Sequence, residues 1–469
     1  MDLSFRFFSR FGDLVILSVI TLIGVAIRAS FVFDPVRYDE AYTYLNFVRL
    51  PFVTTLSDYS LPNNHILHSL LVKCFVLLFG DTELVLRSVA LFFGVILIPF
   101  TYYVARLYVS RVYALFVSLC VAFSHYAIFY SVNARGYTLS AFLLLLGVLI
   151  LHRCVSDRTL KYPLFLGLIS ASALFTVPSN APFILALYVG WFYLMQTRHV
   201  IRWYPLFFSG FFGIFVTLLL YSGVIARSGL GQITNNDFVA RLTYHEFFSR
   251  LAISLNEWIT SFTLDTPLVF SVFLLGFFLV GLWISVRSRQ IPGLLFVVTG
   301  VWLVVCAQLP PSRVLFPLVP FFYLLVLQGF EFLYMLYHRY FDISRYYFYI
   351  ITIFLVYFIF FSRFSIASLP ETGYFPDHRA ACNKIHEIST RNDRVKVVDG
   401  DAAFDFCYFK DDLEYYKDFS GKVYWVYTDN SYGRDWINQN LAGIPYTQEA
   451  CIGTVNIVSV MFDPRTFSQ

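Results

Sequence analysis

The feature that most constrains this chain is the recurrence of apolar segments close to the length of a membrane-spanning helix. Hydrophobic residues make up 58% of the 469 positions and charged residues only 14%, which is too little charge to coat a soluble protein of this length. Because a helix needs about 20 apolar residues to cross a bilayer, we expect a polytopic α-helical membrane protein with about eleven transmembrane helices. The expected spans are residues 14–33, 85–105, 112–131, 136–152, 162–178, 180–196, 204–226, 267–286, 291–309, 313–337 and 346–362.

Positive charges in alternate connectors predict the orientation of these helices. Arg106 with Arg111 and Arg287 with Arg289 lie in such connectors, which the positive-inside rule places in the cytoplasm together with the amino terminus. All these connectors fall on one side only if residues 64–80 do not cross the membrane. We therefore expect 64–80 to form an interfacial or half-inserted helix, and a true crossing is the alternative.

The outer face is then expected to collect the loops 34–84 and 227–266. Near residue 363 the composition changes from Phe-rich runs to alternating apolar and charged residues. We expect two domains, a transmembrane domain at 1–362 and an extracytoplasmic α/β domain at 363–469. The predicted elements of the second are an amphipathic helix at 376–390, strands at RVKVVDG, KVYWVYTDN and CIGTVNIVSVMF, and a helix near 433–440.

Cysteine usage and net charge narrow the environment and the partners. The tail carries Cys382, Cys407 and Cys451, and two of them could form a disulfide if the tail is extracytoplasmic, with no pairing preferred. The net charge is only +4 and the arginines are scattered, which argues against nucleic acid as a partner.

Two adjacent carboxylates, Asp39 and Glu40, follow the first apolar segment in the sequence YDEAYTYL. Ionised carboxylates are costly close to the hydrocarbon core, which favours a functional role. The alternative is that they stabilise the amino end of a helix beginning near Tyr38, where acidic side chains complement the helix dipole.

A polar cluster lies further along the same loop, in the sequence DYSLPNNHILHSLL. Its members are Asp58, Asn63, Asn64, His65 and His68. Such a cluster fits the recognition of a sugar or a phosphate head group. An asparagine could instead cap the following helix, and His68 could reach towards the membrane interface.

Two arginines stand at predicted outer membrane boundaries, Arg135 in NARGYTLSA and Arg313 in PPSRVLFPLVPF. Arginine on the outer side opposes the positive-inside trend, so each is expected to pair with an anion such as a protein acid, a lipid head group or a bound phosphate. Ordinary snorkelling explains either arginine singly. Tyr137, two residues after Arg135, is a candidate substrate contact.

Taken in order, these segments resemble the GT-C glycosyltransferases that use polyprenyl-phosphate-linked sugars, in particular glycosyltransferase family 39. The resemblance rests on YDEAYTYL, LPNNHILHSLL, FGDTELVLRSVALFFGVILIPFTYYVARLY, NARGYTLSAFLLLL, SRVLFPLVPFFYLL and PDHRAACNKI, and extends over about residues 1–160 and 300–400. That family includes protein O-mannosyltransferases and lipid A aminoarabinose transferases. The chain departs from the family at PNNH, where relatives carry a basic residue and two prolines, and it lacks a second Asp near NARGY.

The resemblance implies an inverting transfer on the outer face, from a polyprenyl-phosphate sugar to a hydroxyl of a glycan, lipid or protein. By resemblance Asp39 is the catalytic base, with Glu40 beside it, while Arg135 and Arg313 bind the departing phosphate with His65 as a helper. We expect no cofactor and no required metal. The absence of an Asn-x-Ser/Thr pattern favours a bacterial inner membrane, with the amino terminus cytoplasmic and the tail periplasmic.

Two other classes of function remain open on the sequence. A transporter or flippase of a lipid-linked saccharide would carry charges near the membrane midplane and paired broken helices, and FTVPSNAPF at 175–183 does interrupt an apolar run. A non-catalytic scaffold would leave Asp39 and Glu40 without a role. If the protein is an enzyme, replacing Asp39 with alanine should abolish sugar transfer, whereas a flippase or a scaffold should keep its activity and fold.

Overall fold

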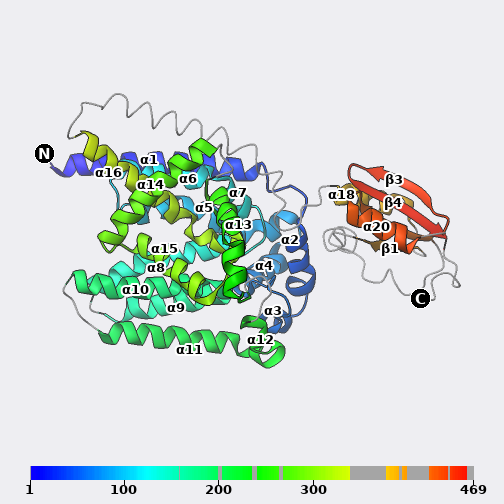
Figure 1. Ribbon diagram of the computed structural model, residues 1–469, viewed down its shortest axis with the longest axis horizontal. Coiled ribbons are helices and arrows are strands. Elements are labelled where there is room, and N and C mark those ends of the chain that lie inside the picture. Colours follow the sequence, from blue (N-terminus) through cyan, green and yellow to red (C-terminus); the bar gives the residue numbers. More distant parts are fainter. Residues whose placement is uncertain are drawn as a thin grey trace. The chain divides into compact units, whose positions relative to one another are not determined.

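The computed structural model describes residues 2–157, 159–198, 203–234, 240–263, 268–338, 377–389, 393–398, 422–441 and 444–461. The chain divides into two compact units (Figure 1). One unit consists of Met1–Phe33 and Phe52–Ser368, and the other of Asp34–Pro51 and Leu369–Gln469. The expected boundary at residues 362 and 363 lies outside the described residues and stays a prediction.

The first unit is a bundle of helices. Its helices are α1 (Asp2–Ala29), α3 (Phe52–Ser57), α4 (Ile66–Phe79), α5 (Glu83–Ala105), α6 (Arg111–Phe123), α7 (His125–Ser131), α8 (Tyr137–Ser156), α9 (Lys161–Thr176), α10 (Ala181–Thr197), α11 (Trp203–Ser228), α12 (Gly231–Thr234), α13 (Tyr244–Thr263), α14 (Leu268–Arg287), α15 (Ile291–Cys306) and α16 (Val319–His338), with 3-10 turns η2 (Pro178–Asn180) and η4 (Ser312–Leu318). Within the described residues, six helices are long and apolar enough to cross a membrane, and α6 with α7 adds a seventh if the bent pair is one span.

These helices confirm the expected polytopic membrane fold, with a number of crossings that remains approximate. The expected span at 346–362 lies outside the described residues. Helix α4 has 14 residues, about 21 Å at 1.5 Å per residue, which is shorter than the roughly 30 Å hydrocarbon core. Whether it crosses stays a prediction.

Burial separates central helices from peripheral ones in the bundle. In the apolar stretch from Ser312 to His338, 83% of the most apolar window is buried, whereas the corresponding share is 22% for α11 and 17% for α14. Large apolar side chains such as Phe207, Phe211 and Leu219 are exposed along α11. In a membrane protein such faces contact lipid, so α11 and α14 lie at the periphery.

The expected continuous span at 112–131 is broken at Ser124, where α6 and α7 meet at 57°. The fully buried guanidinium of Arg28 donates to the carbonyl of Ala122 at 3.0 Å and to Ser131 Oγ at 3.0 Å. Buried backbone carbonyls at a break need new donors, and Arg28 supplies one. The apolar pattern alone did not indicate this bend.

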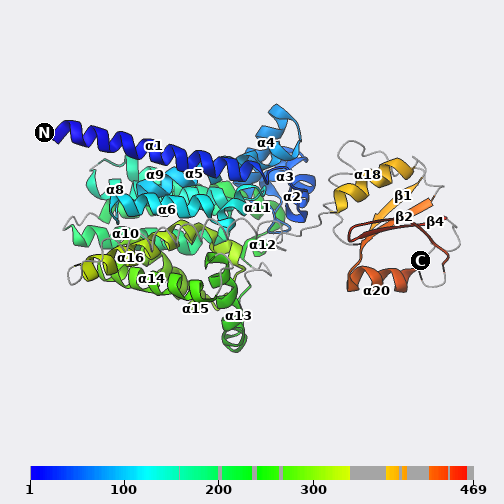
Figure 2. The same ribbon diagram turned by 90° about the horizontal axis from the view of Figure 1, so that it is seen from above.

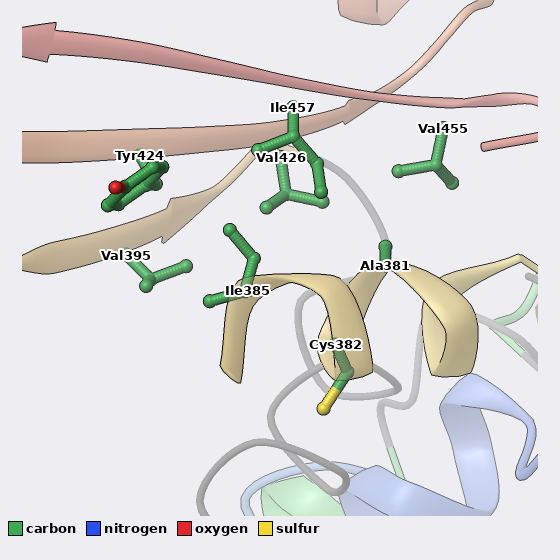
Figure 3. Close-up of a cluster of buried hydrophobic side chains, with 8 residues drawn as sticks. All are labelled: Ala381, Cys382, Ile385, Val395, Tyr424, Val426, Val455 and Ile457. Atoms are coloured by element: carbon green, nitrogen blue, oxygen red, sulfur yellow. The ribbon is translucent and has the colours of Figure 1, made fainter. Parts of the chain in front are cut away.

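The second unit contains a four-stranded sheet in the order β1-β2-β4-β3, in which β1 is parallel to β2 and the other pairs are antiparallel. Its elements are α18 (His378–Ile388), β1 (Arg394–Val397), β2 (Lys422–Thr428), α20 (Ser431–Asn440), β3 (Thr447–Ile452) and β4 (Val455–Met461). Ala381, Cys382 and Ile385 of α18 belong to one core cluster with strand residues (Figure 3), and Ile437 of α20 belongs to another. This confirms the small α/β domain.

One expected strand is wrong, because CIGTVNIVSVMF is a hairpin and not a single strand. Strand β3 ends at Ile452, and Gly453 adopts a positive φ of 55° that turns the chain into β4. The Asp377 carboxylate fixes this turn by accepting from the backbone N–H and the hydroxyl of Thr454, both at 2.8 Å. A lone glycine within an apolar run hid the turn.

The cysteines of the tail differ from one another. Cys382 is disulfide-bonded, which agrees with the expectation of a disulfide in this part of the chain. Cys451 is free. Cys407 lies outside the described residues.

Candidate active site

A cavity with about 530 Å³ of empty space, part of it open to solvent, lies within the first unit. Five residues proposed from the sequence line it, namely Asn63, His65, Arg135, Tyr137 and Arg313. The other lining residues are Tyr59, Pro62, Val177, Pro178, Ser179, Ile233, Pro311 and Val314. Segments far apart in the sequence therefore bring polar groups to one place.

These residues meet because each belongs to an interruption between helices. His65 precedes α4, Arg135 lies in the turn between α7 and α8, and Arg313 is in η4 before α16. Helices α3 and α12 lie at the same end of the bundle in both views (Figures 1 and 2). Because turns between spans lie at membrane boundaries, this end supplies the polar walls.

The guanidinium of Arg135 is held firmly although it carries a charge. Only 3% of the residue is exposed. Its Nη1 donates to the carbonyl oxygen of Asn63 at 2.8 Å, and its guanidinium carbon lies 6.0 Å from the centre of the Tyr137 ring. These contacts fix its orientation before any ligand arrives.

His65 and Arg135 place two donors side by side. The backbone N–H of Gly136 donates to His65 Nδ1 at 2.8 Å, so in the neutral imidazole the proton is on Nε2. Burial, followed by the charge of Arg135, lowers the pKa of His65 well below its ordinary value, which keeps the ring neutral. His65 Nε2 lies 3.3 Å from Arg135 Nη2, and a guanidinium can only donate. Two adjacent donors are satisfied together by one anionic oxygen.

An aromatic wall supports the pair. The His65 and Tyr137 rings meet edge to face with centroids 4.9 Å apart, and Tyr130 packs 4.8 Å from Tyr137 and 5.1 Å from Phe316 of η4. Tyr59 also lines the cavity, and burial raises the pKa of its hydroxyl, which is therefore a neutral group. The wall links the three interruptions that carry His65, Arg135 and Arg313.

A second cavity, with about 760 Å³ of empty space that is partly open to solvent, lies beside the first and shares Pro178, Ser179, Ile233 and Val314 with it. Its remaining lining residues are mainly apolar: Ala181, Pro182, Phe183, Thr299, Trp302, Leu303, Gln308, Pro310 and Leu315. The cationic cavity, lined by Arg135 and Arg313, thus borders a largely apolar one. This pairing suits a ligand that joins an anionic head to a hydrocarbon chain.

Three candidates from the same loop do not line the first cavity. Asp58 forms an ion pair with Arg227 at 3.3 Å. Asn64 is fully buried, and its amide donates to the carbonyls of Thr55 at 2.9 Å and Asp58 at 2.8 Å. His68 is buried within α4. These residues shape the loop that presents Asn63 and His65.

Sequence reasoning did not single out Tyr59, Val177, Pro178, Ser179 or Ile233 as site residues. A signal existed for three of them, because FTVPSNAPF interrupts an apolar run. The structure places 3-10 turn η2 there, between α9 and α10. Ile233 carried no such signal.

The acid pair belongs to the second unit, in α2 (Tyr38–Thr43), which continues into the π-helix Tyr44–Val48. Glu40 is 2% exposed, and its carboxylate accepts from the backbone N–H of Arg37 at 2.9 Å. That contact caps the helix, as the alternative interpretation required. Asp39 is partly exposed, and its carbonyl oxygen accepts from the Thr43 hydroxyl at 2.8 Å.

Part of the chain matches the model of a known protein family. Residues 63–226 match the family model described as dolichyl-phosphate-mannose-protein mannosyltransferase. A comparison with curated proteins finds no match. The matched segment contains Asn63, His65, Arg135 and Tyr137 of the cavity.

Solved structures resemble the chain over most of its length. ArnT from Cupriavidus metallidurans in the apo state matches with a TM-score of 0.63 and 13% identity, covering 96% of this chain and 98% of that one. The same protein bound to undecaprenyl phosphate gives a TM-score of 0.62 at 13% identity and the same coverage. The oligosaccharyltransferase AglB from Archaeoglobus fulgidus, in complex with an inhibitory peptide and a dolichol-phosphate, matches with a TM-score of 0.53 and 12% identity over 86% of this chain and 60% of that one. These matches show that the chain shares the fold of ArnT and AglB, which confirms the GT-C fold expected from the sequence.

Proposed function

We propose that this protein is a membrane glycosyltransferase that moves a sugar from a polyprenyl-phosphate donor to a hydroxyl of a glycan, lipid or protein acceptor. The observation that carries the proposal is the adjacent donor pair, His65 Nε2–H and Arg135, 3.3 Å apart in a cavity that Arg313 also lines. One phosphate oxygen satisfies both donors. The adjoining apolar cavity suits the isoprenoid chain.

The chemistry of transfer explains why such a cavity is useful. As the sugar carbon is attacked, the bond to the phosphate oxygen breaks and negative charge accumulates on the departing phosphate. Guanidinium groups that are already oriented stabilise this charge without reorganisation. The neutral imidazole of His65 donates a further hydrogen bond to the phosphate from Nε2, and it does so without carrying a charge of its own.

The acceptor hydroxyl is a poor nucleophile until a base accepts its proton. We assign this role to Asp39, with Glu40 holding the helix that carries it through its contact with Arg37. A single displacement by the acceptor oxygen inverts the anomeric centre. Because two guanidinium groups, those of Arg135 and Arg313, line the cavity, we propose that the reaction needs no metal ion.

We place the reaction on the outer face of a bacterial inner membrane, with the amino terminus in the cytoplasm and the tail domain in the periplasm. Support comes from the positive charges of the alternate connectors and from the disulfide at Cys382, since disulfides persist in oxidising compartments. ArnT, which shares the fold, binds undecaprenyl phosphate, and AglB binds a dolichol-phosphate.

The test compares Asp39→Asn with Glu40→Gln in purified protein. A panel of undecaprenyl-phosphate hexoses and pentoses serves as donor, membrane lipid extract as acceptor, and released undecaprenyl phosphate is measured by mass spectrometry. Removal of a general base should lower transfer by roughly 100- to 10,000-fold. Binding of farnesyl phosphate, which contains no sugar, should be unchanged in Asp39→Asn. Full transfer by Asp39→Asn would contradict the assignment of the base. If the unmodified protein transfers sugar from none of the donors, a flippase or scaffold is favoured instead.

A further inference from the structure

Helix α13 (Tyr244–Thr263) has an amphipathic pattern. Its buried side chains are Phe247, Trp258, Phe262 and Thr263, which anchor it to the bundle. Tyr323 of α16 donates to the carbonyl of Phe262 at 3.3 Å. Figure 2 shows α13 running across the long helices and not parallel to them. Helix α13 therefore crosses the long helices and is held against them by apolar packing and by a hydrogen bond.

The start of this segment is bonded to the last turn of α15 and to the residue that follows it. The backbone N–H of Leu242 donates to the carbonyl of Ala307 at 2.9 Å, and the Tyr244 hydroxyl donates to the carbonyl of Val305 at 3.2 Å. Ala307 has a left-handed φ of 48°, an unusual conformation for a non-glycine residue. The hydrogen bond from Leu242 helps to hold that turn.

The far end of α13 is bonded to the residues immediately before Arg313. The indole Nε1–H of Trp258 donates to the carbonyl of Pro310 at 2.9 Å. The carboxylate of Glu257 accepts from the backbone N–H of Ser312 at 2.9 Å. Both contacts involve backbone atoms, so they fix the path of the chain and not merely a side chain.

We propose that Glu257 and Trp258 are positioning residues that set the place of Arg313 in the cationic cavity, a role that rests on the proposed function. Residues 308–311 form no helix or strand, so the contacts from α13 define where η4 and Arg313 begin. Arg313 lines the cavity, and its charge contributes to the lowered pKa of His65. A shift of the loop carrying Arg313 weakens its contact with a phosphate.

The experiment measures the affinity of the purified full-length protein for farnesyl phosphate, with farnesol as the uncharged comparison. Glu257→Ala should weaken farnesyl phosphate binding by about 3- to 10-fold, the effect of one charge-assisted hydrogen bond acting indirectly, and should leave farnesol binding unchanged. Glu257→Gln keeps an acceptor oxygen and should restore most of the affinity. Trp258→Phe removes the donor but keeps an aromatic ring, and should resemble Glu257→Ala. The exposed neighbour Asn256→Ala is the matched control and should bind as the unmodified protein does.

A double-mutant cycle separates positioning from a general effect on the fold. If Glu257 acts through Arg313, Glu257→Ala should have no further effect in an Arg313→Ala background, whereas independent effects would multiply. Multiplied effects, or a Glu257→Ala variant with full affinity, would overturn the inference while Arg313→Ala still shows a loss. If Arg313→Ala itself has no effect, the proposed phosphate site is wrong, and that failure is distinguishable from the first.

Discussion

If His65 Nε2 and Arg135 donate together to a phosphate, two substitutions of His65 should affect phosphate binding differently. In His65→Asn the side-chain oxygen takes the place of Nδ1 and can still accept from the N–H of Gly136, but the donor at the Nε2 position is lost. In His65→Gln the longer amide can reach the Nε2 position and donate. A hydrogen bond to a charged acceptor contributes about 1.5–3 kcal/mol, so His65→Asn should bind farnesyl phosphate roughly 10- to 150-fold more weakly.

The assay is a titration of purified protein with farnesyl phosphate, followed by native mass spectrometry and repeated with farnesol. His65→Gln should retain affinity within a few-fold, and farnesol binding should be the same in all three proteins. Thermal unfolding of each variant checks that the bundle is intact. The reasoning is refuted if His65→Asn binds farnesyl phosphate normally, or if it loses affinity for farnesol to the same degree.

Four further predictions concern the same residues and the tail domain. Because the pKa of His65 is lowered in the folded protein, the unfolded chain takes up a proton first as the pH falls below about 6.5. The free energy of unfolding should therefore fall with decreasing pH in that range, by up to about 1.4 kcal/mol per pH unit from this residue. Denaturant titrations at several pH values should show a shallower dependence on pH in His65→Asn. Gly136→Ala would place a Cβ 2.8 Å from Thr176 Cγ2 and 3.1 Å from His65 Nδ1; farnesyl phosphate binding should weaken, and Thr176→Ser should partly restore it. In Gly453→Ala the new methyl group meets both a positive φ of 55° and a clash with the Asp377 carboxylate, so the tail should lose about 1–3 kcal/mol of stability, seen as earlier proteolysis of the full-length protein. Transfer should persist in EDTA, and its loss with recovery on adding Mg²⁺ or Mn²⁺ would contradict the metal-independent mechanism.

The helices of the bundle were predictable because apolar length is set by bilayer thickness. Helices α5, α8 and α11 lie where the apolar runs placed them, within a few residues at each end. The bend at Ser124 was not predicted: Ser124 and His125 interrupt the apolar run there, but no proline or glycine marks a kink. It depends on Arg28, a residue about 100 positions away whose guanidinium meets the carbonyls at the break.

The cavity residues were partly predictable from topology. Asn63 and His65 were assigned to the outer loop 34–84, and Arg135 and Arg313 to predicted outer membrane boundaries; the structure brings all four to one cavity. Asp58 was assigned to the same loop as Asn63, but pairs with Arg227 instead. Position along a loop gives the side of the membrane, whereas the direction of each side chain depends on tertiary contacts that the sequence does not display.

Many of the hydrogen bonds that hold the residues of the cavity are made to backbone atoms. Arg135 donates to the carbonyl of Asn63, His65 accepts from the N–H of Gly136, and the residue before Arg313 donates to Glu257. Each contact uses a group that would otherwise be unsatisfied at a break between helices, and each restrains a side chain or a stretch of backbone beside the proposed phosphate site. A polyprenyl-phosphate sugar that enters the cavity would therefore meet groups that folding has already ordered. More of the interaction free energy is then left for binding and for stabilising the transition state. It follows that the residues holding the cationic groups should affect donor affinity without touching the donor, and that affinity and fold stability should respond separately to their substitution.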